Sequence, residues 1–265
     1  MNLLQYLAFL LVQLYYSGPE KTLKFPVAEF SAHVKTAEWL IMYDSAAWRL
    51  SEEVTHADMD LLQRTGREWF VYLGSRDSLW YGAYGRFQDS AYDLAMHYRI
   101  NREDSIEIVT EAKPDTAMLH AVSRCIRSAY KFAGMMLGRS YVRMNKFVRL
   151  NNDRSISIYL LPALQPAEVA MYGGEFHYRF DETGQRLLER NEYYRGGFKG
   201  FRLNNDREVK LAYEDVKSPT LGAVYFALRF RNRFKEIRIE TLESMSLLLF
   251  NQTRGYYWDH REKPQ

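Results

Sequence analysis

Apolar and polar residues alternate with a period of two in many short runs of this 265-residue chain, and this alternation limits its fold more than any other feature. Neighbouring side chains of a β-strand point to opposite faces, so such a run predicts a strand with one buried face. From residue 68 onwards these runs are rich in tyrosine, phenylalanine, valine and isoleucine, which favour strands. The pattern predicts antiparallel sheets built from meanders and hairpins.

Two turn sequences, GSRDS and QDS, separate the first three runs and predict an antiparallel meander. In the third run Asp93, His97 and Arg99 alternate with apolar side chains, which indicates a sheet with one solvated or ligand-facing side. The predicted strands cover residues 68–73, 79–87, 92–100, 147–150, 155–161, 169–180, 186–194, 209–213, 237–241 and 246–250. The last of them is expected to extend through Trp258.

Helices are predicted where apolar residues recur at spacings of three and four. The clearest begins at Pro114 and Asp115, which suit a helix start. Shorter helices are predicted over 36–43, from about residue 46, over 58–64 and over 220–231. The chain is therefore expected to have an α+β fold, in which residues 36–265 form one domain or two subdomains divided near 113–146. The apolar face of the long helix comprises Met118, Val122, Cys125, Ala129, Phe132 and Met136.

The N-terminal sequence MNLLQYLAFLLVQLYYSGPEK contains an apolar run, Leu3–Tyr16, that is shorter than the roughly 20 residues of a transmembrane helix. Its composition suits an export leader, although no Lys or Arg precedes it and Tyr15–Gly18 is a poor small-residue cleavage site. We expect a leader over 1–18, an extended linker over 19–35, and an exported or periplasmic protein. The alternative is a first helix that packs on the core of a cytoplasmic protein.

The single cysteine, Cys125, excludes an intrachain disulfide and a multi-cysteine zinc site. It lies on the apolar face of the predicted helix, which favours a buried small side chain over a nucleophile. The net charge of +3 is too small to indicate a nucleic-acid-binding protein. No nucleic-acid partner is expected, and membrane association is expected only through the N-terminal segment.

The hexapeptide RLNNDR occurs twice, at 149–154 and at 202–207, and each copy lies between two predicted strands. Asparagine and aspartate tolerate left-handed backbone and bond their own main chain. The flanking sequences share only alternation, so the repeat indicates one type of turn used twice.

Glu175, His177 and Arg179 share one face of the predicted strand 169–180. Glu175 and His177 are candidates for a general base with an orienting partner, or for two metal ligands. The more common alternative, which we favour, is an ordinary polar face paired across a hairpin with Arg190 and Glu192. None of the six histidines forms an H-x-H or H-x-x-x-H pair, so no metal and no cofactor are expected.

No Asp or Glu occurs between residues 116 and 152. On the predicted helix His120, Arg124, Arg127 and Lys131 form a basic stripe opposite the apolar face, and Arg124, Arg127 and Lys131 are candidates for binding an anion. We favour a solvated helix face. Binding of single-stranded nucleic acid also needs aromatic rings between the cations, and only Tyr130 lies there.

Enzyme motifs are absent: the chain has no G-x-S-x-G elbow, no phosphate loop, no G-x-G-x-x-G and no H-E-x-x-H. An ordered set of motifs from residue 68 onwards resembles a family of uncharacterised bacterial proteins with an N-terminal leader. That resemblance implies no activity, cofactor or catalytic residue. The motifs are EWF (68–70), YGAYG (81–85), YLLPA (159–163), YGGEFHYRFD (172–181), GGFKGF (196–201) and SPTLGAVYF (218–226).

Residues 172–250 are also similar to the sheet of JAMM-type metallopeptidases, through a strand glutamate and a later Pro-Thr helix start. That family needs H-x-H-P and a following Asp, whereas this region has no histidine pair and Ala223 stands at the Asp position. Together these patterns predict a binding or structural protein of the cell envelope. The alternative is a hydrolase that uses Glu175 and His177.

Overall fold

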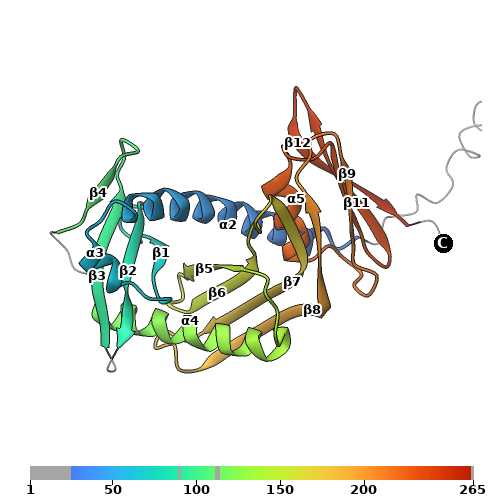
Figure 1. The fold of residues 1–265 in the computed structure, drawn as a ribbon. Helices are drawn as coiled ribbons and strands as arrows, with labels where there is room; N and C mark the ends of the chain where they lie inside the picture. Colours follow the sequence, from blue (N-terminus) through green and yellow to red (C-terminus); the bar gives the residue numbers. More distant parts are fainter. Residues whose placement is uncertain (1–24, 89–90, 111–113, 264–265) are drawn as a thin grey trace, which may run out of the picture.

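The computed structural model describes residues 25–88, 91–110 and 114–263, which form four helices and three four-stranded sheets (Figure 1). The α+β class with antiparallel sheets is confirmed; one strand pair in the third sheet is parallel. The first sheet is a meander of β1 (Phe70–Leu73), β2 (Trp80–Gln88), β3 (Ala91–Ile100) and β4 (Ile106–Ile108). The central sheet has β5 (Met144–Leu150), β6 (Ile156–Pro162), β7 (Val169–Phe180) and β8 (Leu187–Arg202) in that order.

The C-terminal sheet has the order β12-β11-β10-β9. Its strands β10 and β9 are the parallel pair, and α5 (Leu221–Phe230) lies in the connection between them. This helix packs on β7 and on β10 and therefore joins the central sheet to the C-terminal one. The strands are β9 (Glu208–Ala212), β10 (Glu236–Glu240), β11 (Ser244–Asn251) and β12 (Gly255–Glu262).

Two long helices lie on opposite sides of the central sheet (Figure 1). α2 (Val27–Val54) contacts α5, and its C-terminal part contacts the first sheet. α4 (Thr116–Leu137) packs on β6, β7 and β8, and a fourth helix, α3 (Met59–Gln63), is short. The predicted helix over 114–136 is confirmed: the Asp115 side chain accepts a hydrogen bond from Ala117 N, and Cys125 is fully buried. Met136, at the far end of the expected apolar face, is exposed.

The prediction of an extended linker is wrong for residues 27–35, which are helical. The two helices expected over 36–43 and from about 46 are likewise one uninterrupted helix, α2. Asp44 does not cap a second helix; its carboxylate pairs with Arg229 of α5. The proposed leader, 1–18, lies outside the described residues, as does 19–24 of the linker. The buried positions of α2 continue at helical spacings along its whole length: Phe30, Ala37, Leu40, Tyr43, Ala46, Leu50 and Val54.

One expectation about strands is also wrong. Residues 255–262 form a separate strand, because the Asn251 side chain accepts from Thr253 N and closes a turn after β11. On the face of β3 predicted to be solvated or ligand-facing, Asp93 and Arg99 are half-buried. His97 on that face is buried: its Nε2 lies 3.0 Å from the Tyr72 hydroxyl and its ring stacks on Tyr81. β4 was not foreseen, and β8 continues to Arg202.

The two RLNNDR copies form turns with the same backbone bond, as predicted. Arg154 N donates to Asn151 O at 3.0 Å, and Arg207 N donates to Asn204 O at 3.1 Å. The first turn connects β5 to β6 within the central sheet, whereas the second connects β8 to β9 of another sheet.

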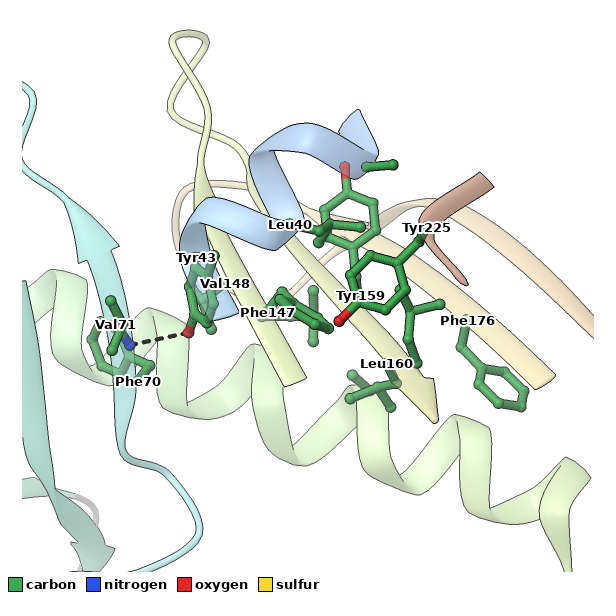
Figure 2. Packing of buried hydrophobic residues seen from close by; sticks show 14 of the residues in the cluster. Leu40, Tyr43, Phe70, Val71, Phe147, Val148, Tyr159, Leu160, Phe176 and Tyr225 are labelled. Atoms are coloured by element: carbon green, nitrogen blue, oxygen red, sulfur yellow. Dashed lines mark hydrogen bonds between the residues drawn. The ribbon is translucent and has the colours of Figure 1, made fainter. Parts of the chain in front are cut away.

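The core is a continuous cluster of buried apolar side chains from the helices and all three sheets. Figure 2 shows Tyr43 of α2 among Phe70, Phe147 and Val148, with its hydroxyl accepting from Val71 N at 3.0 Å. The strands β1 and β5 pack beside one another without being paired in one sheet. Tyr43 therefore satisfies a backbone donor at the edge of the first sheet, which would otherwise be buried without a partner.

Candidate functional site

The face of β7 that carries Glu175 and His177 forms one wall of a cleft of about 670 Å³, called here the Glu175 cleft. The predicted alternation is confirmed, since Glu175, His177 and Arg179 are half-buried while Phe176, Tyr178 and Phe180 are buried on the other face. The remaining walls come from α2, β6, β8 and the segment before α5, including Glu29, His33, Tyr159, Asn191, Tyr193 and Thr220.

The partners of these residues across the hairpin differ from the predicted ones. Glu175 lies opposite Tyr193 and His177 opposite Asn191, so Arg190 and Glu192 are not their cross-strand neighbours. The cause is a register shift between Arg179 and Phe180, which places one extra residue on β8. A one-residue shift moves every following side chain to the other face of the strand. Glu192 instead accepts from the Tyr178 hydroxyl and pairs with Arg190.

The carboxylate of Glu175 lies at the first turn of α5. Its Oε2 accepts from Gly222 N, while Thr220 caps the helix by accepting from Ala223 N at 3.3 Å. The other oxygen, Oε1, is buried and has no hydrogen-bond partner among the residues that the structure describes. The positive end of a helix dipole favours a carboxylate, so this position suits a charged Glu175.

The glycine at 222 makes this approach sterically possible. A Cβ at this position would lie 2.8 Å from the Glu175 carboxyl carbon. Any other residue would therefore displace either the carboxylate or the helix start. Glu175 and the start of α5 are separated by more than forty residues in sequence, and the contact depends on the absence of a side chain at Gly222.

Burial is the dominant influence on Glu175 and raises its pKa from 4.5 to about 7. The Gly222 N–H, which donates to Oε2, and the nearby Thr220 side chain act in the opposite direction. The carboxyl group therefore exchanges a proton near neutral pH, which is the range in which general acids and bases work best.

His177 stacks on Tyr159, with ring centroids 4.3 Å apart and planes 8° from parallel. Its Nε2 is buried and unpartnered within the described part of the chain. Burial lowers the pKa of His177, so the neutral imidazole is favoured at neutral pH. Glu189 and Arg179 act on it in opposite directions.

A hollow of about 400 Å³ adjoins the cleft along β7 and shares Tyr159, His177 and Glu189 with it. The two hollows form a groove along the polar face of the central sheet. His177 lies where they meet, and Glu175 lies in the larger one.

Two residues of the cleft, His33 and Glu29, were not among the candidates from the sequence. From α2, His33 donates from Nδ1 to Pro219 O at 3.1 Å, and Glu29 accepts from the Ser218 hydroxyl at 3.2 Å. This stretch of α2 was expected to be a linker, so neither side chain was a candidate. The helical spacing of Phe30, Ala37 and Leu40 was the available signal.

The basic stripe on α4 does not converge on a site with Glu175 and His177. Arg124 donates from Nε to Thr183 O at 3.1 Å, Arg127 lies over the Phe87 ring, and Lys131 is exposed. His120 is half-buried against the edge of the same Phe87 ring. Burial raises the pKa of Cys125 to about 12, so this thiol is a buried apolar side chain, as predicted.

Within residues 25–88, 91–110 and 114–263, no three His, Cys, Asp or Glu side chains are grouped so that they could hold a metal ion. No helix in these ranges is long and apolar enough to cross a bilayer. A scan against protein-family models found no match, and neither a curated protein nor a solved structure was found to be significantly similar to the chain.

Proposed function

We propose that this protein binds an elongated polar ligand, rich in hydroxyl or ammonium groups, along the groove over β7. The observation that carries the proposal is a pair of buried atoms, Glu175 Oε1 and His177 Nε2, that lack partners among the described residues. Buried polar atoms in folded proteins almost always have a hydrogen-bond partner. A ligand that donates to the carboxylate and bonds to the imidazole would supply both.

The remaining walls are consistent with this class of ligand. Glu29 and Glu189 add carboxylates, Asn191 adds an amide, and Tyr159 and Tyr193 add aromatic rings. Carboxylates accept hydrogen bonds from hydroxyl and ammonium groups. The N-terminus of α5, where an anionic ligand would otherwise be favoured, is already occupied by the Glu175 carboxylate.

The test is calorimetric titration of the full chain with three probes: chitotriose, its deacetylated ammonium form, and a sulfated trisaccharide. We expect binding of the first or second probe and none of the third. Glu175→Gln and His177→Ala should each weaken binding at least about tenfold, the range expected for loss of a buried hydrogen bond. Glu182→Gln, in the exposed turn after β7, is the matched control. Binding of none of the probes, or equal binding by all the variants, would refute the ligand class.

A second function, hydrolysis of the bound ligand, is favoured by the pKa of Glu175 near 7. In this mechanism the carboxylate takes a proton from a water molecule that attacks the ligand, and His177 orients the water or the ligand. Loss of a general base typically costs about 10²–10⁴-fold in rate. Product analysis after incubation with each binding probe distinguishes this enzyme from a binding protein, and any turnover should be lost in Glu175→Gln.

The location in the cell envelope is part of the same proposal and is supported by the apolar run Leu3–Tyr16. Expression of the full sequence in a bacterial host, followed by fractionation and mass measurement of the N-terminus, tests it. Recovery in the envelope fraction supports the proposal. Recovery of the intact chain in the cytosol contradicts it.

A further inference from the structure

A second cleft, of about 730 Å³, lies where α2, α4, β5 and the segment before β1 meet, and is called here the Lys146 cleft. It shares none of its lining residues with the Glu175 cleft. Its volume is within the range of small-molecule sites. The side chains that define its chemistry are Trp48, Arg67, Trp69, Tyr130, Arg143 and Lys146.

Three cations line this cleft without an ion-pair partner in the described part of the chain. Lys146 donates from Nζ to Arg67 O at 3.0 Å, and neither it nor Arg67 or Arg143 forms an ion pair in the described part of the chain. The acid in the lining, Asp44, is paired with Arg229 at 2.9 Å. The cleft therefore has an excess of positive charge, which favours an anionic ligand.

Aromatic rings lie beside these cations. Lys146 Nζ is 3.9 Å from the centroid of the Trp69 ring. Trp48 of α2 is 67% exposed and Tyr130 of α4 is 38% exposed, although large aromatic side chains are usually buried. Flat apolar surfaces next to guanidinium groups match a flat ring that carries a negative charge, because the ring packs on the aromatics and the charge is bound by arginine.

The half-buried amine of Lys146 adds a nucleophile to this site. Burial lowers its pKa from 10.5 to about 7, with Glu68 acting in the opposite direction. A large fraction of Lys146 is therefore the neutral amine at neutral pH. A neutral amine adds to a carbonyl carbon; loss of water then gives an imine, with the carbonyl oxygen leaving in that water and no net oxidation or reduction.

We propose that the Lys146 cleft binds a planar aromatic anion, with Arg67 and Arg143 at its charged group and the aromatic side chains at its ring. When such a ligand carries an aldehyde beside the ring, Lys146 condenses with it. This site and the groove over β7 are independent, so the proposal does not rest on the function of Glu175.

The probe that tests all three features is pyridoxal 5′-phosphate, which combines a flat ring, a phosphate and an aldehyde. The full chain is incubated with it near neutral pH, reduced with borohydride, and mapped by peptide mass. We expect Lys146 to be labelled at least about tenfold faster than Lys131, an exposed lysine on α4, because the cleft holds the probe beside the Lys146 amine. Pyridoxal, which lacks the phosphate, should label Lys146 at least about tenfold more slowly.

The variants separate the parts of the site. Arg67→Gln with Arg143→Gln should slow labelling by the phosphate probe and leave labelling by pyridoxal unchanged. Lys146→Met should remove the labelled peptide, and Lys131→Arg should have no effect at Lys146. In the unaltered chain pyridoxine 5′-phosphate, which has no aldehyde, should compete with the probe. Labelling spread equally over exposed lysines, equal rates with and without the phosphate, or absence of competition would each overturn the proposal.

Discussion

The Glu175 cleft and the Lys146 cleft contain side chains of opposite charge that respond to the same cause. Burial raises the pKa of Glu175 to about 7 and lowers that of Lys146 to about 7, because desolvation disfavours whichever form is charged. The two clefts differ in what offsets this effect. Glu175 accepts from a helix N-terminus, whereas Lys146 donates to one carbonyl and contacts one ring.

This difference shows how a site is assembled around each group. The carboxylate is held by a contact that requires Gly222, and Glu29 and Glu189 add further acceptors to its cleft. The amine lies in surroundings that are mainly aromatic and cationic. The first cleft therefore selects donors, the second selects anions, and a change in one should leave the other intact.

The largest expected effect on stability is that of Tyr43→Ala. Tyr43 lines the Lys146 cleft and not the Glu175 cleft, so this change should disrupt only the former. Tyr43 is 1% exposed and contacts Trp80 and Phe147. Its truncation should lower the free energy of unfolding by about 3–5 kcal/mol, the range for buried aromatic side chains. Labelling of Lys146 should be lost, while ligand binding over β7 persists.

Tyr43→Phe is the control for this prediction, since it keeps the ring and removes only the acceptor for Val71 N. Its cost should be about 1–3 kcal/mol, that of a buried donor without a partner. Chemical denaturation measures both variants. A smaller cost for Tyr43→Ala than for Tyr43→Phe would contradict the role of the ring at this junction.

The next effect is on the pH dependence of stability, in which the two clefts should produce opposite slopes. The native chain keeps the Glu175 proton that the unfolded chain loses, so this group reduces stability as pH rises from about 4.5 to about 7. The native chain loses the Lys146 proton first, so this group increases stability as pH rises from about 7 to about 10.5. Each group should contribute about 1–3 kcal/mol to the free energy of unfolding. Because both side chains are only half-buried, solvent screens part of the effect that the full pKa shift would have.

Denaturant unfolding at a series of pH values separates these slopes. Glu175→Gln should remove the decrease on the acidic side and leave the alkaline side unchanged, and Lys146→Met should do the reverse. If either variant altered both sides, the two clefts would be coupled, and the comparison between them would fail.

A smaller effect is expected from Gly222→Ala, which sharpens the comparison by acting only on the Glu175 cleft. The new Cβ would meet the carboxyl of Glu175, so we expect a loss of about 1–2 kcal/mol and weaker ligand binding. Gly134→Ala in α4 is the matched control, because a Cβ there meets no atom within 4 Å. That exposed helical position should gain about 0.5–1 kcal/mol. Thermal unfolding of both proteins gives the sign directly, and equal signs would argue against the close approach at Gly222.

The smallest effect should follow from the basic stripe on α4. Arg127→Gln with Lys131→Gln should change stability by less than about 0.5 kcal/mol, since both side chains are exposed. The same variant should leave labelling of Lys146 unaltered. Titration with single-stranded and duplex nucleic acid at physiological salt should show no micromolar binding that depends on Arg124 and Arg127. Such binding would show that the stripe is a site after all.

The candidate site could be predicted from the sequence only in part. Strand alternation placed Glu175 and His177 on one face, and the Pro-Thr signal placed the start of α5. Their meeting could not be predicted, because no local pattern relates Glu175 to Gly222. The bulge in the β7–β8 hairpin, which changes the cross-strand partners, also left no signal in the alternation.

The Lys146 cleft was not predicted at all. Lys146 lies just before the predicted strand 147–150, where no pattern marks it, although the observed strand begins at Met144. Trp48 falls two residues into a predicted helix and carries no signal of a site. The only sequence signal is the absence of acids between residues 116 and 152, which covers Lys146 and Arg143. Arg67 and Trp69 come from a distant segment, and α2 places them beside the others.

The sequence by itself determined the α+β class, most strands, the start of α4 and the burial of Cys125, because each depends on side chains within one or two turns or strand repeats of each other. The tertiary structure decided the continuity of α2, the register of β8 and both clefts. Both clefts depend on close approach between segments far apart in the chain. The shifted pKa values of Glu175 and Lys146 arise from desolvation, which occurs only once those segments are packed.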